Sequence, residues 1–208
     1  MIKPLILILS LISLILIATG CQVKSAARSA EVANRPANSA AHEPVEQRPK
    51  LQLPLRQPKI VVKKGQRQLL LFSEGKLVRT YHIGLGLSPV GDKVRQGDRR
   101  TPEGDFYIFT KNDKSAYYLS LGVSYPNATH AERGLRDGLI TNAQHDTIMN
   151  ALRAKKGPPQ NTRLGGDIYI HGNGSQSDWT WGCVALENED IRELFNAVNV
   201  GTPMTIRP

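Results

Sequence analysis

Short apolar runs separated by polar turns begin at residue 60. Strands are expected over residues 60–62, 68–72 and 77–83, because β-branched, leucine and aromatic side chains are concentrated there. The two connections, 63–66 and 73–76, are polar and contain glycine, which favours tight turns. This pattern predicts a meander of short antiparallel strands.

The second half of the chain carries further strand signals between long connections. Strands are expected over residues 106–109, 117–125, 167–170 and 204–206, and a short apolar run follows at 182–186. Residues 84–104 are rich in glycine, proline and charge, so they predict a long loop with turns.

Two helices are expected among these strands. Thr141 and Gln144 can form a capping box, and the run that follows stops at Gly157-Pro158. This helix and its flanks, residues 130–165, are expected to form a flap over an active site, with His130 and His145 on the surface. The second helix is expected to start at Asn188 as N-cap. Its apolar stripe is spaced for packing on a sheet and consists of Ile191, Leu194, Phe195 and Val198.

The strongest chemical signal lies in residues 171–186. Cys183, one of two cysteines in the chain, follows His171 by 12 positions, and both have glycine neighbours. A thiol attacks as its thiolate, and a nearby histidine can supply the base. Gly182 lets backbone N–H groups approach a substrate carbonyl, as an oxyanion hole requires. These residues alone leave open the alternative of a buried cysteine that packs near an unrelated histidine.

At these residues the chain resembles the YkuD-type L,D-transpeptidases, enzymes that remodel bacterial peptidoglycan. The family pattern is a strand ending in His-Gly, an insert, and then Ser/Thr-x-Gly-Cys, which matches His171-Gly172 and residues 180–183. Upstream segments that match in family order are 59–62, the Gly84-Leu85-Gly86 turn, Gly97-Asp98 and the TPEG turn at 101–104. The resemblance covers residues 58–208.

The resemblance implies a mainly β fold, a curved sheet or sandwich of the L,D-transpeptidase type with a helical insertion and a C-terminal helix. It implies that Cys183 forms a thioester with a tetrapeptide stem and that His171 is the base. Thr180 and Gly172 would orient the site, and backbone N–H groups near Gly182 and Cys183 would hold the oxyanion. The side chains expected to contact substrate are Trp179, Trp181 and Tyr118. No cofactor is implied, and the protein is expected to be a monomer that acts on peptidoglycan peptide stems.

Two positions depart from the pattern of many family members. Trp181 stands where many have a second histidine, and Ala185 stands where many have an arginine. Transfer of the stem to an amine acceptor is the expected function. The alternatives are a peptidoglycan hydrolase on the same scaffold and a wall-binding lipoprotein without catalysis.

The start of the chain predicts export. Lys3 precedes an apolar run over residues 5–17, and small residues follow, which is typical of a secretory signal over 1–20. The ending ATGC resembles a bacterial lipobox, so Cys21 is expected to be lipidated, and Gln22 suggests an outer-membrane anchor on the periplasmic side of the envelope. An ordinary signal peptide or an uncleaved anchor is the alternative. Residues 21–57 are poor in large apolar side chains and predict a flexible tether.

The net charge of +9 fits an anionic partner, although solubility alone would also explain it. Nucleic acid is not expected, since the export signal is present and no base-stacking or helix-turn-helix pattern occurs. Nucleotide binding is also not expected, because the Gly84-Leu85-Gly86 turn lacks a dinucleotide or P-loop pattern. The scattered histidines and acids predict no metal site, and His82 is expected to be a packed or rim residue.

Overall fold

The computed structural model describes residues 48–208. The expected signal segment, Cys21 and most of the expected tether lie outside these residues. The elements described begin at Lys59 and consist of eight strands, one 3-10 turn (η2, Lys64–Gln66) and three α-helices. The strands are β1 (Lys59–Lys63), β2 (Gln68–Ser73), β3 (Lys76–His82), β4 (Gly104–Ser115), β5 (Tyr118–Val123), β6 (Tyr169–His171), β7 (Val184–Ala185) and β8 (Pro203–Arg207).

All eight strands join in one sheet with the order β3-β2-β1-β8-β4-β5-β6-β7. The predicted meander is confirmed, because β1 pairs with β2 and β2 with β3 in antiparallel register. The last strand, β8, lies between β1 and β4, so the end of the chain holds the two halves of the sheet together. The mainly β, curved-sheet fold class is therefore confirmed.

The two ends of the sheet meet through the residues that follow β3. Gly84 N–H donates to Ala185 O at 2.9 Å, and Ala185 N–H donates back to Gly84 O at 2.8 Å. A Cβ on residue 84 would lie 2.3 Å from Ser177 O, so only glycine allows this approach. The first hairpin is thereby attached directly to β7, the strand that follows Cys183.

Alternate side chains of the strands form the main core. Ile60, Val62, Leu69 and Leu71 are fully buried, as period-2 alternation toward one face requires. The apolar stripe of α3 (Asn188–Ala197) packs into the same core through side chains that include Ile191 and Leu194. These aliphatic side chains carry most of the stabilisation that burial provides.

The expected N-cap of α3 is wrong by one residue. Glu187 is the N-cap, and its side chain makes no capping bond. The side chains of both residues are used by the loop before β7 instead. Asn188 Oδ1 accepts from Asn173 N–H at 2.9 Å, and Glu187 Oε1 accepts from Ser175 N–H at 2.8 Å. The two side chains therefore hold the loop that follows His171 and do not cap the helix.

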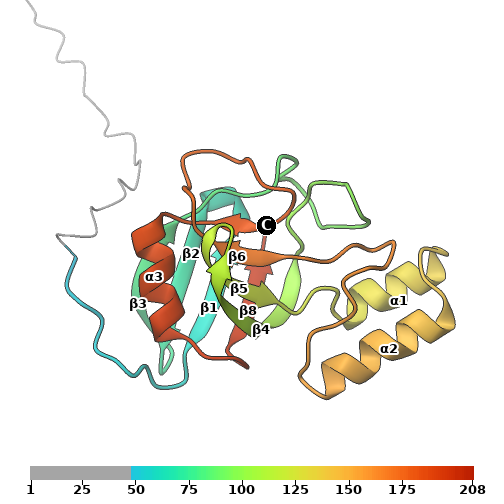
Figure 1. The fold of residues 1–208 in the computed structure, drawn as a ribbon, viewed down its shortest axis with the longest axis horizontal. Coiled ribbons are helices and arrows are strands. Elements are labelled where there is room, and N and C mark those ends of the chain that lie inside the picture. The colour runs from blue at the N-terminus through green and yellow to red at the C-terminus, as the bar shows by residue number, and fades with distance from the viewer. Residues whose placement is uncertain (1–47) are drawn as a thin grey trace, which may run out of the picture. The chain divides into compact units, whose positions relative to one another are not determined.

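The insertion contains two helices where one was expected. α2 (Asn142–Arg153) begins at Thr141 with the predicted capping box. α1 (Ala128–Arg136) precedes it and is capped by the Asn127 side chain. The two helices pack on their own small apolar cluster, and they lie at the opposite side of the sheet domain from α3 (Figure 1).

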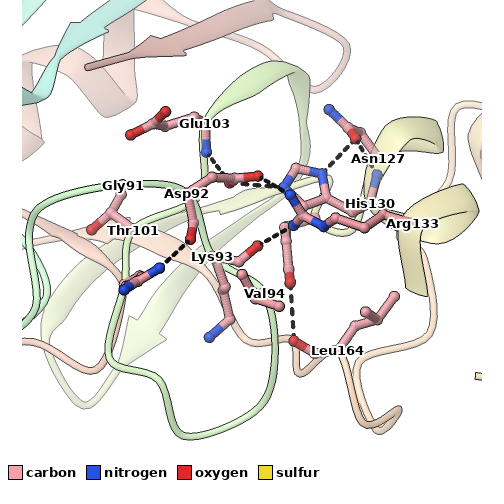
Figure 2. A network of polar contacts seen from close by, with 12 residues as sticks. Gly91, Asp92, Lys93, Val94, Thr101, Glu103, Asn127, His130, Arg133 and Leu164 are labelled. Atoms are coloured by element: carbon pink, nitrogen blue, oxygen red, sulfur yellow. Dashed lines mark hydrogen bonds and ion pairs between the residues drawn. The ribbon is translucent and has the colours of Figure 1, made fainter. Parts of the chain in front are cut away.

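His130 is buried, which corrects the expectation that it lies on the surface. Its exposed fraction is 1%, and Nε2 lies 3.0 Å from Asp92 Oδ1 (Figure 2). Nδ1 faces Asn127 Oδ1, and the Asn127 amide is fixed because its Nδ2 donates to Asp105 O. Both ring nitrogens therefore have an oxygen partner, one on the 84–104 loop and one at the cap of α1. His145 lies half-buried on α2.

Asp92 connects the 84–104 loop to α1. Burial acts to raise its pKa, but hydrogen bonds from His130, the Glu103 N–H and Arg133 outweigh burial and hold the pKa well below its usual value. Arg133 Nη1 lies 2.8 Å from Asp92 Oδ2. Figure 2 shows these groups converging on the carboxylate from the loop and the helix. The charged network fastens the insertion to the sheet domain.

The substitution Asp92→Asn is expected to lower the free energy of unfolding by about 2–4 kcal/mol at pH 7, since Arg133 loses its anion and buried His130 loses its carboxylate partner. Because the pKa of Asp92 is lowered in the folded state, its carboxylate contributes stability that is fully present above the unfolded-state pKa of about 3.9. This contribution is lost as the pH falls from that value through the folded-state pKa. The gap between wild type and variant should therefore narrow below about pH 4. Urea unfolding at several pH values measures it, and Asp146→Asn on the exposed face of α2 is the control. Equal stability of Asp92→Asn and wild type at pH 7 would contradict the network.

Candidate active site

A cavity of about 450 Å³ opens beside β6 and the β4–β5 hairpin. The residues that line it are Asn112, Lys114, Ser115, Ala116, Tyr117, Ser120, Asp167, Tyr169, His171, Trp179, Thr180, Trp181 and Cys183. No residue of α1 or α2 is among them, so the expectation that the insertion covers the site is wrong. The hairpin forms that wall instead. A larger cavity of about 690 Å³ near Val61 and Pro203 is lined by no histidine, cysteine or acid and offers no comparable chemistry.

Strand register places the cysteine and the histidine on one face. β6 and β7 are parallel, with Ile170 opposite Val184 and His171 opposite Ala185. Continuing the register sets Cys183 opposite Tyr169. Side chains alternate between the two faces of a strand, so Ile170 and Val184 enter the core while Tyr169, His171 and Cys183 face the cavity. The pairing explains how residues 12 positions apart share one site.

The His171 ring is held in one tautomer. Its Nδ1–H donates to Gly172 O at 2.8 Å, so Nε2 carries the lone pair. The ring centroid lies 4.7 Å from that of Tyr117 and 5.5 Å from that of Trp179. Burial lowers the pKa of His171 below its usual value of 6.5, against the raising effect of the Gly172 hydrogen bond. A neutral imidazole that can accept a proton is therefore present at pH 7.

Cys183 is a protonated thiol at rest. Burial raises its pKa to about 11. Sγ accepts from Tyr169 N–H at 3.4 Å and its S–H donates to Asp167 O at 3.4 Å. Within residues 48–208 no hydrogen bond joins Sγ to His171. The thiol must therefore rotate away from Asp167 O before His171 can take its proton.

Thr180 holds the backbone around Cys183. Its Oγ1 donates to Cys183 O at 2.8 Å and accepts from Gly182 N–H at 3.1 Å. Gly182 has φ +128°, and a Cβ there would lie 2.7 Å from Arg100 O, so glycine is required. Of the two N–H groups expected to hold the oxyanion, that of Gly182 is already bound to Thr180 Oγ1. The Cys183 N–H has no hydrogen-bond partner within residues 48–208 and can take that role.

The remaining expected site residues separate into two groups. Trp179 lies against His171, and Gly172 fastens the strand end to the hairpin by donating its N–H to Tyr117 O at 3.0 Å. Trp181 lies at the rim, 66% exposed, with the Arg99 guanidinium 4.7 Å from its ring centroid. Tyr118 is exposed, has φ +72° and does not line the cavity.

The hairpin tyrosine that lines the cavity is the neighbour of Tyr118, the residue expected to contact substrate. Tyr117, one residue before β5, contacts the His171 ring and lines the cavity. Strand alternation could have warned that only one of two adjacent tyrosines faces the site. The turn at 116–118 decides which one, and sequence does not fix its geometry.

Two further findings concern residues 48–208 only. No group of three or more histidine, cysteine or acidic side chains is arranged to hold a metal ion there. None of the helices in this part of the chain is long and apolar enough to cross a bilayer.

The pH dependence of Cys183 alkylation checks the resting protonation state. With a pKa of about 11, the thiolate fraction rises about tenfold per pH unit up to that value, so iodoacetamide should react slowly at pH 7 and accelerate steadily through pH 10. Peptide mapping separates Cys183 from Cys21, and a small free thiol is the reference. A plateau reached below pH 8 would mean that the resting nucleophile is a thiolate.

The family model described as the L,D-transpeptidase catalytic domain (YkuD) matches residues 57–206. Among solved structures, an L,D-transpeptidase from Xylanimonas cellulosilytica is 19% identical with a TM-score of 0.43, covering 77% of this chain and 64% of that one. The helical cell shape determining protein Pgp2 from Campylobacter jejuni is 22% identical with a TM-score of 0.48, covering 72% and 46%. An L,D-transpeptidase from Mycobacterium smegmatis is 12% identical with a TM-score of 0.44, covering 73% and 59%.

The chain thus spans less than two thirds of each of these three structures. No curated protein matches the sequence significantly.

Proposed function

The chain belongs to the family of L,D-transpeptidase catalytic domains, and from this premise we propose that it is a cysteine-dependent L,D-transpeptidase acting on peptidoglycan tetrapeptide stems. One observation carries the proposal. Cys183 and His171 line a single cavity, and His171 Nδ1 is held by Gly172 O so that Nε2 is the free base. A thiol and a neutral imidazole in one cleft form the nucleophile and base of acyl transfer.

In the acylation step, His171 Nε2 takes the proton of Cys183 as Sγ attacks the carbonyl at the L-centre of the third stem residue. A new C–S bond forms, and the carbonyl oxygen becomes an oxyanion that accepts from the Cys183 N–H. The imidazolium then gives its proton to the departing nitrogen. The C–N bond breaks, D-alanine leaves as a free amine, and the stem remains as a thioester.

In the second step, an amine of another stem attacks the thioester carbonyl. His171 Nε2 accepts a proton from that amine and returns it to the departing Cys183 sulfur. An amide bond forms as the C–S bond breaks, which gives a cross-link between two stems. Water in place of the amine would give a trimmed stem and make the protein a hydrolase.

Product analysis tests the proposal. The purified protein and a Cys183→Ala control are each incubated with disaccharide-tetrapeptides. The products are identified by mass spectrometry. Cross-linked dimers that lack one D-alanine, formed only when Cys183 is present, are the expected result. Shortened monomers without dimers would make the protein a hydrolase. If no product forms and no stem becomes attached to Cys183, the alternative of a wall-binding lipoprotein replaces the proposal.

The N-terminal segment supports a proposal on location. Because the apolar run at 5–17 is followed by ATGC, we propose that Cys21 is lipidated and anchors the protein at the periplasmic side of the outer membrane. Residues 22–57 would then separate the anchor from the domain. Labelling of cells with a fatty-acid analogue tests this, since a Cys21→Ser variant should take up no label while wild type does.

A further inference from the structure

Asp167 places a free carboxylate in the catalytic cavity. The residue lines the cavity and is exposed to solvent. Within residues 48–208 its carboxylate has no hydrogen bond and no ion pair. Lys114 lines the same cavity, but no ion pair joins the two. The protein has a net charge of +9, yet this carboxylate in the cavity pairs with none of its cations within residues 48–208.

The backbone of Asp167 is fixed at both ends. Its N–H donates to Gln160 Oε1 at 2.7 Å, and its carbonyl accepts from the Cys183 S–H at 3.4 Å. The residue has φ +54°, a conformation that favours Asp, Asn and Gly over other side chains. The main chain is thus held while the side chain stays free.

The carboxylate charge acts against the nucleophile. Burial is the main cause of the raised pKa of Cys183, and the negative charge of Asp167 raises it further. Asp167 likewise adds to the effect of burial in raising the pKa of the neighbouring Tyr169 phenol. An acid that hinders thiolate formation is unfavourable in the free protein. That cost disappears when a cation binds the acid and neutralises it.

We propose that the Asp167 carboxylate is a subsite for a primary ammonium group carried by the substrate, such as that of a diaminopimelate residue in a peptide stem. The proposal rests on the proposed function and extends it. Ammonium binding pairs the carboxylate and removes its repulsion of the developing thiolate. The reactive form of Cys183 is thereby favoured only when a stem with a free amine is in place.

Binding to a Cys183→Ala background tests the subsite without turnover. The probes are the disaccharide-tetrapeptide with its diaminopimelate amine free and the same compound with that amine acetylated. Acetylation is expected to weaken binding by roughly fivefold, because one ion pair in a half-open cleft is lost. Adding Asp167→Asn should weaken binding of the free-amine probe by a similar factor. The double variant should then bind the free-amine and acetylated probes equally well. Asn suits φ +54°, so this variant should fold.

Asp113→Asn is the matched control, since it removes the same charge from the exposed hairpin strand outside the cavity. The control should retain the discrimination. Alkylation of Cys183 is a second measurement that needs no substrate. At pH 8, Cys183 of the Asp167→Asn variant should react with iodoacetamide about threefold faster than that of wild type. An Asp167→Asn variant that alkylates no faster than wild type would overturn the coupling to the thiol.

A second arm locates the ammonium on the donor or on the acceptor stem. Wild type is loaded with the acetylated donor as a thioester, and the rate of its aminolysis by a free-amine stem is compared with Asp167→Asn. Discrimination in binding assigns the subsite to the donor, and a loss only in aminolysis assigns it to the acceptor. If Asp167→Asn matches wild type in both arms, the subsite is wrong. If wild type forms no thioester at all, the proposed function fails, while amine discrimination in binding still decides the subsite.

Discussion

Replacement of Cys183 by alanine is expected to lower kcat/KM for stem transfer by about 10⁴-fold or more, because no other group can form the thioester. Release of D-alanine and formation of cross-links should be lost together. Cys183 is half-buried and the change removes one sulfur atom, so the free energy of unfolding should fall by no more than about 1.5 kcal/mol. Mass detection of the protein with a stem attached measures the covalent step directly.

Cys183→Ser is the matched variant, since it keeps the shape of the side chain and removes only the thiol. Its hydroxyl ionises far less readily, so serine should rescue little activity even with His171 intact. Retention of more than a tenth of wild-type activity by Cys183→Ala would require a different nucleophile. The catalytic assignment would then fail, whatever the variant's stability.

Replacement of His171 by glutamine is expected to lower kcat/KM by about 10³-fold at pH 7, since the thiol with a pKa of about 11 loses the base that accepts its proton. Wild-type activity should also fall as the pH drops through the pKa of His171, which burial places below 6.5. The variant should lack this acidic limb and gain activity steadily toward high pH, where hydroxide ionises the thiol. A kcat/KM profile from pH 4 to 10 measures both effects.

His82→Gln is the control for this change. His82 lies at the end of β3, and its Nδ1 is 3.3 Å from Ser175 Oγ, outside the cavity lining. Its replacement should change kcat/KM by less than about threefold. If His171→Gln keeps the acidic limb of wild type, another group titrates in that range and His171 is not the base.

Much of the sheet could be predicted from sequence because its signals are local. The first three strands carry alternating or continuous apolar runs bounded by glycine turns, and the structure places them at the predicted positions. The capping box at Thr141 is also a local feature and is confirmed. The α3 stripe was found for the same reason. Local patterns succeed where the packing they imply agrees with the fold.

The misplaced features depend on partners that lie far away in sequence. His130 was assigned to the surface because nothing within α1 shows that Asp92, 38 positions earlier, will face it. The α1 helix itself has few apolar positions, and its Asn127 cap and buried His130 hold it in ways that periodicity does not show. Asn188 has a strong preference for capping, yet the loop after His171 claims its side chain.

The site shows the same division. The motif pointed to Cys183 and His171, and both line the cavity. The parallel pairing of β6 and β7 sets the two side chains on one face. The free carboxylate of Asp167 and the stacking of Tyr117 on His171 come from the turns before β6 and β5. Neither turn has a sequence signature that fixes its side-chain directions, so these residues needed coordinates.

The bridge between Gly84 and Ala185 has a consequence for how the protein meets other chains. A strand at the border of an open sheet offers unpaired N–H and C=O groups, to which a foreign strand can add. β7 would be such a border, and Cys183 directly precedes it. Because Gly84 already occupies both hydrogen-bonding groups of Ala185, that border is sealed from within the chain. An extended peptide that enters the cavity therefore cannot bind by adding a strand to the sheet at Ala185. It has to be bound by side chains and by the Cys183 amide.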